Sequence, residues 1–189
     1  MLDLCLALEP ETVLDIGSGY GKWGFLMKLH SFKKKPYIIG VDFSLEHIRL
    51  AQKASMYDEL VLADATKLPF RDRTVDIALV CEVIEHTSKK DGLNLLNEAE
   101  RVTQQRVIAT TPQLYESFIG SPDHITKWDI EELKALGYKV RGAGLAVFNK
   151  KRGKIASLLR HFILKPLVYV FPSISEFMVC IKDLKGDKT

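Results

Sequence analysis

The sequence is poor in cysteine and has no long uninterrupted apolar run, and both shortages exclude classes of protein. Its three cysteines, Cys5, Cys81 and Cys180, are odd in number, far apart and without the spacing of metal ligands. A disulfide scaffold and a zinc finger are therefore excluded, and we expect a reduced, cytoplasmic protein. No run of about 18 uncharged apolar residues predicts a membrane span, and positions 1–3 lack the basic start of a secretory signal.

The chain also lacks a strong charge of either sign, internal repeats and low-complexity segments. Its formal net charge is +3, from 27 Lys and Arg against 24 Asp and Glu, which is too small to indicate a polyanionic partner by itself. Hydrophobic residues make up 47% of the chain and charged residues 27%, as in an ordinary globular protein. The length of 189 residues predicts a single domain that covers residues 1–189.

What the chain does contain is a glycine-rich turn between an apolar strand and an apolar helix. Residues 13–16 have the character of a short buried strand, and a helical apolar pattern begins at Trp23. Glycines stand at alternate positions between them: Gly17, Gly19 and Gly21. Glycine is needed where the backbone visits positive φ and where a ligand approaches the main chain. The stretch therefore predicts the first strand–helix unit of a nucleotide-binding α/β fold.

Asp15 lies two residues before the first glycine and distinguishes between the ligands that such a turn can bind. A dinucleotide places its pyrophosphate at the helix N-terminus. A carboxylate there would repel the pyrophosphate, whereas it would attract a cationic ligand. The spacing Gly19-x-Gly21-x-x-Gly24 also satisfies the dinucleotide pattern. The turn alone therefore favours a cationic ligand and leaves a nicotinamide oxidoreductase open.

Two further acids follow the second and third predicted strands. Asp42 comes 21 residues after Gly21, which is close to the spacing of the acid that binds ribose hydroxyls in this architecture. Ser44 is the better N-cap for the next helix, so Asp42 is left for a ligand. Asp64 and Ala65 stand at the end of the third strand.

Apolar runs and helical spacings alternate along the chain. The predicted strands are 13–16, 37–41, 59–63, 75–80, 106–110, 138–148 and 175–184. The predicted helices begin near Trp23 and then cover 45–55, 91–102 and 126–136. We expect Thr126 to cap the last helix and Gly137 to end it. This alternation predicts an α/β fold with a mainly parallel sheet and helices on both faces.

A cluster of polar side chains follows the fourth and fifth predicted strands. Glu82, Glu85 and His86 come directly after the fourth, and His124 stands in the loop after the fifth. Ligands bind beyond the carboxyl ends of strands in this fold, so all four are expected at that edge. They can hold a divalent metal, or His86 can act as a general base, or the run only packs and caps. Cys81 is interpreted as a buried thiol whose backbone contacts the ligand.

The run from Asp15 to Gly21 resembles motif I, acid-x-Gly-x-Gly-x-Gly, of the class I S-adenosylmethionine-dependent methyltransferases. The later acids and the run after the fourth strand occur in the family order, so the resemblance covers roughly residues 11–145. It implies a Rossmann-like, seven-stranded, mainly parallel sheet with the last strand antiparallel and helices on both faces. It also implies S-adenosylmethionine as cofactor, whose sulfonium and ammonium groups suit the charge of Asp15.

The resemblance implies a role for each of these residues. Asp15 would support the amino-acid end of the cofactor, Asp42 would hold the ribose, and Asp64 would accept from the adenine amino group. Phe43 is expected beside the adenine. The remaining expected cofactor contacts are Gly17, Ser18, Gly19, Gly21, Ala65 and Cys81.

Two groups within the family resemble the chain at the run Glu82-x-x-Glu85-His86: the ubiquinone-type O-methyltransferases and the small-RNA terminal 2′-O-methyltransferases. In the RNA enzymes this run and a later histidine hold magnesium. The resemblance therefore implies a Mg²⁺ site made by Glu82, Glu85, His86 and His124. We expect His86 and Glu85 to be the catalytic residues.

Residues 150–174 separate the last two predicted strands. They begin with a basic cluster and continue as an apolar stretch with two prolines. Three interpretations stay open: a packed crossover, a lid or apolar wall for the substrate, and a membrane-surface contact beside the basic cluster.

The sequence as a whole predicts methyl transfer to a small-molecule acceptor through a hydroxyl group, with an apolar substrate favoured by residues 155–171. The alternative is an RNA 3′-terminal ribose 2′-O-methyltransferase. That enzyme would need a basic path to its site, and basic clusters occur at 33–35 and 150–154. A non-catalytic S-adenosylmethionine-binding protein is a third interpretation. Nothing in the sequence indicates an oligomeric state.

Overall fold

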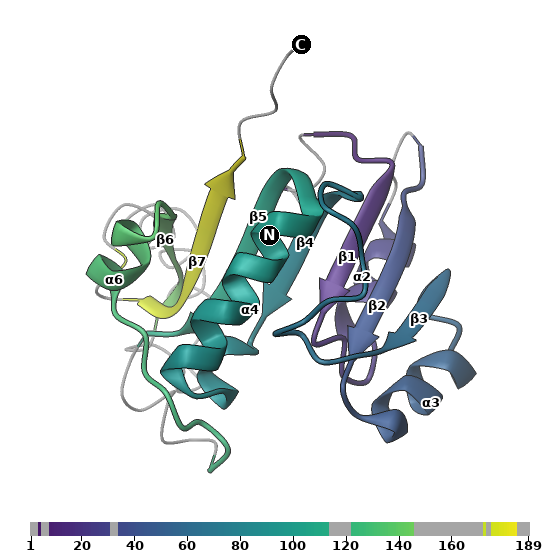
Figure 1. Cartoon of the computed structure of the whole chain (residues 1–189), viewed down its shortest axis with the longest axis horizontal. Coiled ribbons are helices and arrows are strands. Elements are labelled where there is room, and N and C mark those ends of the chain that lie inside the picture. Colours follow the sequence, from purple (N-terminus) through teal and green to yellow (C-terminus); the bar gives the residue numbers. More distant parts are fainter. Residues whose placement is uncertain are drawn as a thin grey trace, which may run out of the picture.

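The computed structural model describes residues 4, 8–30, 34–113, 122–145, 172 and 175–184. Within them the chain forms one seven-stranded sheet flanked by helices (Figure 1). The crossover or lid that we expected over 150–174 lies outside the described residues, apart from position 172. In the part of the chain that is described, no helix is long and apolar enough to cross a bilayer.

The sheet is parallel except for its last strand in sequence. Its strands are β1 (Thr12–Ile16), β2 (Tyr37–Asp42), β3 (Glu59–Leu62), β4 (Val75–Cys81), β5 (Thr103–Pro112), β6 (Lys139–Leu145) and β7 (Ser175–Asp183). Their order across the sheet is β3-β2-β1-β4-β5-β7-β6. Strand β7 pairs antiparallel with both β5 and β6, and the other four pairings are parallel. This confirms the predicted Rossmann-like sheet with an antiparallel last strand.

Helices cover both faces of the sheet (Figure 1). They are α2 (Lys22–Leu29), α3 (Leu45–Lys53), the short 3₁₀ helix η1 (Ile84–His86), α4 (Lys89–Val102) and α6 (Ile130–Ala135). Leu95 of α4 packs into one core cluster, and Met27 of α2 packs into the other. Neighbouring residues of a strand point to opposite faces, and accordingly Val13 and Leu14 of β1 belong to different clusters.

The helix termini follow local sequence signals, with one correction. Ser44 caps α3 as predicted, because its side chain accepts a hydrogen bond from the His47 backbone N–H. Our expectation that Thr126 caps the last helix was wrong. That helix begins after Asp129, which forms a reciprocal capping box with Glu132. The hydroxyl group of Thr126 donates instead to the Thr87 carbonyl.

The topology brings the predicted site residues to one edge of the sheet. The chain leaves β1 toward β2 on one side and later returns to form β4 on the other side of β1. In open α/β sheets, ligands bind beyond the carboxyl ends of the strands at such a switch point. Asp42 ends β2, and Glu82 follows directly after the last residue of β4, so both strands bring an acidic residue to this edge.

Candidate functional site

The turn between β1 and α2 takes its shape from glycines in the left-handed region. Gly17 has φ 73° and Gly21 has φ 91°. A Cβ added to Gly17 would lie 2.5 Å from Val83 Cγ2, and one added to Gly21 would lie 2.8 Å from Met56 Cγ. The backbone N–H groups of Gly17 and Ser18 both donate to the Val41 carbonyl, at 2.8 and 2.9 Å. The turn is therefore anchored to the end of β2.

Gly19 differs from the other two glycines of the turn because it faces open space. Its φ is 50°, and a Cβ added here would meet nothing within 4 Å. Its backbone N–H donates to Asp42 Oδ2 at 2.8 Å. The room above Gly19 is thus available to a ligand.

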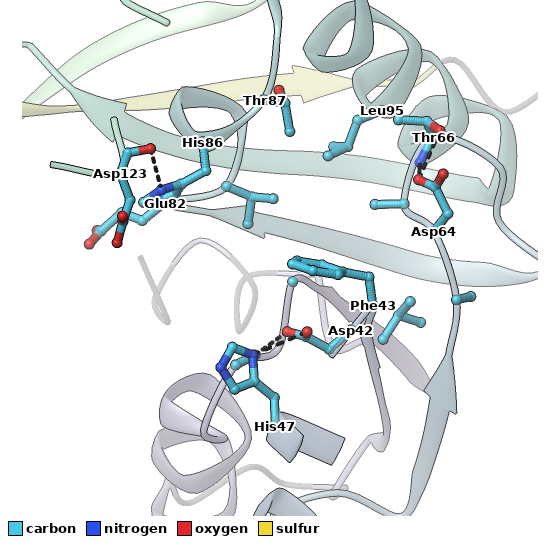
Figure 2. A pocket seen from close by; sticks show the side chains of 16 residues that line it. Asp42, Phe43, His47, Asp64, Thr66, Glu82, His86, Thr87, Leu95 and Asp123 are labelled. Carbon is cyan, nitrogen blue, oxygen red and sulfur yellow. Dashed lines mark hydrogen bonds and ion pairs between the residues drawn. The ribbon is translucent and has the colours of Figure 1, made fainter. Parts of the chain in front are cut away.

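A cavity of about 690 Å³ lies at this edge of the sheet. The labelled side chains form three groups around it: Asp42 with His47, Asp64 with Thr66, and Glu82 with His86 and Asp123 (Figure 2). Of the residues predicted to bind the cofactor, six line the cavity, namely Gly17, Gly19, Asp42, Phe43, Asp64 and Ala65. The other four predicted residues do not line the cavity: Asp15, Ser18, Gly21 and Cys81.

Asp42 is held by three donors at the cavity wall. Oδ2 accepts from the Gly19 N–H, and Oδ1 accepts from the Ser44 N–H at 2.8 Å. The His47 Nδ1 lies 3.2 Å from Oδ1. Asp64 is held more simply, because its Oδ1 accepts from both the backbone N–H and the hydroxyl group of Thr66.

Asp15 lies beneath the glycine turn rather than at the cavity wall. Its side chain is fully buried, and its Oδ2 accepts from the Tyr57 hydroxyl group at 2.6 Å. Burial raises the pKa of Asp15 to about 7; the hydrogen bond from Tyr57 opposes this shift and the charge of Asp42 adds to it. Among the described residues Oδ1 has no hydrogen-bond partner. The role of Asp15 at the amino-acid end of a cofactor stays a prediction.

Tyr57 is a site residue that sequence reasoning missed. Its ring packs against Gly24 of α2 and Gly40 of β2, where an added Cβ would come within 2.7 and 3.0 Å of ring atoms. Burial and the neighbouring Asp15 raise the pKa of the Tyr57 hydroxyl, so the group remains a donor. A glycine inside a buried strand often marks a close approach, so Gly40 was the available signal.

The opposite wall of the cavity is built from the 3₁₀ helix η1 and the loop before α6. The imidazole Nδ1 of His86 lies 3.1 Å from the Asp123 carbonyl oxygen. A carbonyl can only accept, so Nδ1 carries the proton and Nε2 keeps its lone pair when the ring is neutral. The His86 and His124 rings lie 4.7 Å apart, edge to face.

Hydrogen bonds to the carbonyl groups of η1 hold this loop in place. The backbone N–H groups of Ile125 and Thr126 donate to the Glu85 carbonyl at 2.9 and 3.0 Å. The indole N–H of Trp128 donates to the Ile84 carbonyl at 3.1 Å. Two loops that are distant in sequence are thereby fixed side by side, which places His124 next to His86.

The carboxyl group of Glu85 is buried beside the cavity edge of the sheet. The residue has no exposed surface, and among the described residues neither carboxylate oxygen has a hydrogen-bond partner. Burial raises the pKa of Glu85 to about 7, against the opposing effect of its own backbone and the nearby Thr111 hydroxyl group. A buried polar group of this kind requires a partner.

Three of the four predicted metal ligands come together. Glu85, His86 and His124 each offer a ligand atom, and these atoms lie within 4.8 Å of one another. Glu82 lines the cavity but does not belong to that group. Its backbone has a left-handed φ of 58°, a conformation that is uncommon for residues other than glycine.

Sequence comparison identifies the family. Residues 14–109 match the methyltransferase domain family. The demethylmenaquinone methyltransferase of Thermotoga maritima is 32% identical to this chain over 108 residues, which cover 56% of this chain and 44% of that protein. The chain therefore matches less than half the length of this curated relative.

Solved structures share the fold. The small RNA methyltransferase HEN1 superposes with a TM-score of 0.69 at 16% identity, over 98% of this chain and 25% of that one. A methyltransferase dependent on S-adenosylmethionine from Archaeoglobus fulgidus superposes with a TM-score of 0.64 at 18% identity, over 92% and 86% of the two chains. With the family match over half of its length and the glycine turn at the switch point of its sheet, the chain belongs to the class I S-adenosylmethionine-dependent methyltransferases.

Proposed function

We propose that this protein transfers a methyl group from S-adenosylmethionine to a hydroxyl group of a small, apolar acceptor molecule. The observation that carries the proposal is the shared cavity. Its wall contains Gly19 and Asp42 of the expected cofactor side together with His86 of the expected reaction side. The demethylmenaquinone methyltransferase among the relatives is named for a small-molecule acceptor, which supports an acceptor of that class.

The charges around the cavity favour a cationic cofactor over a dinucleotide. Asp64 and Glu82 line the cavity, and Asp15 lies beneath the turn. Asp42 suits the ribose of either cofactor. Carboxylates attract the sulfonium and ammonium groups of S-adenosylmethionine and repel a pyrophosphate. We assign Asp42 to the ribose and Asp64 to the adenine, with Phe43 beside the base.

When bound, S-adenosylmethionine supplies a methyl group activated by a positively charged sulfur. His86 holds the lone pair of Nε2 because its Nδ1–H is bonded to the Asp123 carbonyl. It would therefore be able to accept the proton of the acceptor hydroxyl. Glu85, when ionised, stabilises the imidazolium by its charge.

The cluster of Glu85, His86 and His124 supports a second candidate, a metal-assisted 2′-O-methyltransferase that acts on RNA 3′ ends. Two imidazoles and a carboxylate suit a divalent ion. The oxygens of Glu85, which have no hydrogen-bond partner among the described residues, fit a ligand role. A metal such as Mg²⁺ would supply Lewis-acid chemistry to the acceptor hydroxyl. The structural likeness to a small RNA methyltransferase agrees with this candidate. The basic cluster at 150–154 lies outside the described residues.

Calorimetric titration tests the cofactor assignment. S-adenosylmethionine, S-adenosylhomocysteine and reduced nicotinamide dinucleotide are each titrated with Mg²⁺ and with a chelator. We expect micromolar binding of the two adenosyl ligands and none of the nicotinamide. Binding of the nicotinamide alone would overturn the charge argument and the proposal with it.

Transfer of a radiolabelled methyl group then identifies the acceptor class. The panel contains phenols, quinols and a short RNA with a free 3′-terminal ribose, and the control is His86→Gln. Methylation at the hydroxyl oxygen of a quinol or phenol, established from the product and lost in the control, supports the first candidate, whereas methylation at a ring carbon contradicts the hydroxyl assignment. Methylation of RNA that needs a divalent metal and falls with salt supports the second. Cofactor binding without any transfer would identify a non-catalytic binding protein.

A further inference from the structure

His47 of α3 contacts Asp42, the acid that we expect to bind the ribose. His47 belongs to none of the motifs described in the sequence analysis. It stands in the first turn of α3, five residues after Asp42, and its ring lines the cavity. Its Nδ1 lies 3.2 Å from Asp42 Oδ1 (Figure 2). A carboxylate accepts and does not donate, so this nitrogen carries the proton of the hydrogen bond. The Asp42 side chain is 5% exposed and that of His47 is 29% exposed, so the contact is shielded from water on one side.

The three donors around Asp42 differ in origin. Gly19 and Ser44 donate through backbone N–H groups, which do not involve their side chains. Within the described residues, His47 provides the side-chain donor among these contacts. The orientation of the Asp42 carboxylate therefore depends on which side chain residue 47 carries. It does not depend in this way on the side chains of residues 19 and 44.

His47 also contacts the glycine turn. The ring of Tyr20 lies edge-on to the His47 ring, with centroids 4.6 Å apart and planes at 62°. Tyr20 follows Gly19, whose N–H bonds to Asp42. Two adjacent residues of the turn therefore contact the corner between β2 and α3. Gly19 contacts Asp42, and Tyr20 contacts His47. The imidazole therefore lies between the two segments that form the ribose end of the cavity.

We propose that His47 is a positioning residue that orients the Asp42 carboxylate toward the ribose hydroxyls of the adenosyl cofactor. The inference rests on the proposed function, because it takes Asp42 as the ribose ligand. The Nδ1–H bond fixes Oδ1, which leaves Oδ2 directed by Gly19 for the ligand. Loss of the His47 donor leaves the carboxylate held by the Gly19 and Ser44 backbone N–H groups alone. Oδ1 is then less firmly fixed, and the ligand loses part of the affinity that comes from its hydroxyl groups.

The test compares variants that separate the donor of His47 from its ring. His47→Asn keeps a nitrogen donor close to the position of Nδ1 and removes the ring. His47→Phe keeps a ring against Tyr20 and removes the donor. Both variants retain the N-cap bond of α3, because it uses the backbone N–H of residue 47. Arg49→Ala, at an exposed position of the same helix, is the matched control.

The readout is the preference for ribose hydroxyls. The dissociation constants of S-adenosylhomocysteine and of its 2′,3′-dideoxy analogue are measured by calorimetry for each protein. In the wild type we expect the hydroxyl groups to improve binding by about tenfold or more, since one charge-assisted hydrogen bond contributes about that factor. In His47→Phe the preference should fall several-fold, with affinity for the dideoxy analogue unchanged. His47→Asn should keep most of the preference, and Arg49→Ala should keep all of it.

Each other outcome is decisive. An equal loss for both ligands in His47→Phe would mean that His47 only supports the fold, and an unchanged preference would mean that it does not orient Asp42; either result overturns the inference while leaving the proposed function intact. A loss in His47→Asn as large as that in His47→Phe would assign the effect to the ring and overturn the role of the donor. Failure of the wild type to bind S-adenosylhomocysteine would overturn the proposed function and this inference together.

Discussion

Asp42 lines the cavity and also joins the glycine turn to the start of α3. Its carboxylate accepts from the Gly19 and Ser44 backbone N–H groups. We predict that Asp42→Ala weakens S-adenosylmethionine binding by about 1–3 kcal/mol, because charge-assisted hydrogen bonds to the ribose are lost. Titration calorimetry measures the effect. Asp42→Asn is the control, since it keeps one acceptor oxygen and removes the charge. An unchanged affinity in Asp42→Ala would remove Asp42 from the ribose role.

Asp15 makes the stability of the protein depend on pH. Its pKa is raised from 3.8 to about 7 by burial, so the folded protein holds this proton more tightly than the unfolded chain. The contribution of Asp15 to the free energy of unfolding is fully present below about pH 4 and is lost as the pH rises toward 7. We predict a fall in the free energy of unfolding on the order of 3 kcal/mol across this interval. Urea denaturation at several pH values measures it.

The matched variant for this pH dependence is Asp15→Asn, which still accepts from the Tyr57 hydroxyl but does not titrate. Its free energy of unfolding should vary less with pH than that of the wild type between about pH 4 and 7. Parallel curves for the two proteins would show that Asp15 has an ordinary pKa. All other titratable groups are common to both proteins, so the difference isolates this carboxyl group.

Tyr57 supports the glycine turn from below. Its hydroxyl group donates to Asp15 and accepts from the Gly24 N–H at 3.4 Å. We predict that Tyr57→Phe lowers the free energy of unfolding by about 1–3 kcal/mol, because it leaves a buried carboxyl without its partner. Tyr37→Phe is the control, since the Tyr37 hydroxyl lies at an exposed contact with Glu59. Chemical denaturation that gives equal losses for both variants would contradict this role.

Single residues could be assigned from the sequence where spacing and charge constrained them. Asp42 was predicted from its spacing after the glycine turn and Asp64 from its place after the third strand together with the family resemblance. Both line the cavity. His47 and Tyr57 were not predicted, because their roles come from contacts between segments that no local pattern encodes. Asp15 was assigned to the ligand because of its charge. In the structure it is buried and accepts a hydrogen bond from the Tyr57 hydroxyl group.

At the scale of elements, helix α4 packs closely on the loop before α6. A Cβ added to Gly92 would lie 2.6 Å from Cζ2 of Trp128, whose side chain is 1% exposed. Alanine normally stabilises a helix interior relative to glycine by about 1 kcal/mol. Here we predict that Gly92→Ala destabilises the protein by about 1–3 kcal/mol, because the buried indole cannot move away. Thermal and urea denaturation measure the loss.

A second substitution tests the cause of that loss. The double variant with Trp128→Phe removes the ring atom that Gly92→Ala meets, so the cost of the alanine should be smaller in that background. A double-mutant cycle compares the two costs. If the alanine is equally costly with phenylalanine present, the contact with Trp128 is not its source.

Elements were easier to predict than their limits. All seven strands were expected, since each contains an apolar run. Strand β5 nevertheless begins at Thr103 rather than at position 106, because its first polar residues continue the pairing with β4. Helix α6 begins after Asp129 instead of after Thr126. Thr126 and Asp129 are both good N-cap residues in isolation, and hydrogen bonds to other segments decide which of them caps α6.

The whole molecule should respond to its cofactor as one cooperative unit. The expected site draws residues from the end of β2 and from the segments that follow β1, β3 and β4, so unfolding any of these strands would destroy it. S-adenosylhomocysteine at a hundred times its dissociation constant should raise the free energy of unfolding by about 2.7 kcal/mol. Urea denaturation with and without the ligand measures this increase. The Asp42→Ala protein at the same ligand concentration should gain much less, and an equal gain would place the ligand elsewhere.

The position of β7 has a consequence for how the protein is made. It is the last strand in the sequence, yet it lies between β5 and β6 in the sheet. While the chain emerges from the ribosome, β5 and β6 cannot pair with each other in the native arrangement, and each keeps an open edge until residues 175–183 have been synthesised. Open edges of this kind are sites of mispairing and aggregation. Completion of the sheet must therefore follow translation of β7, and the edges of β5 and β6 stay exposed to mispairing during that interval.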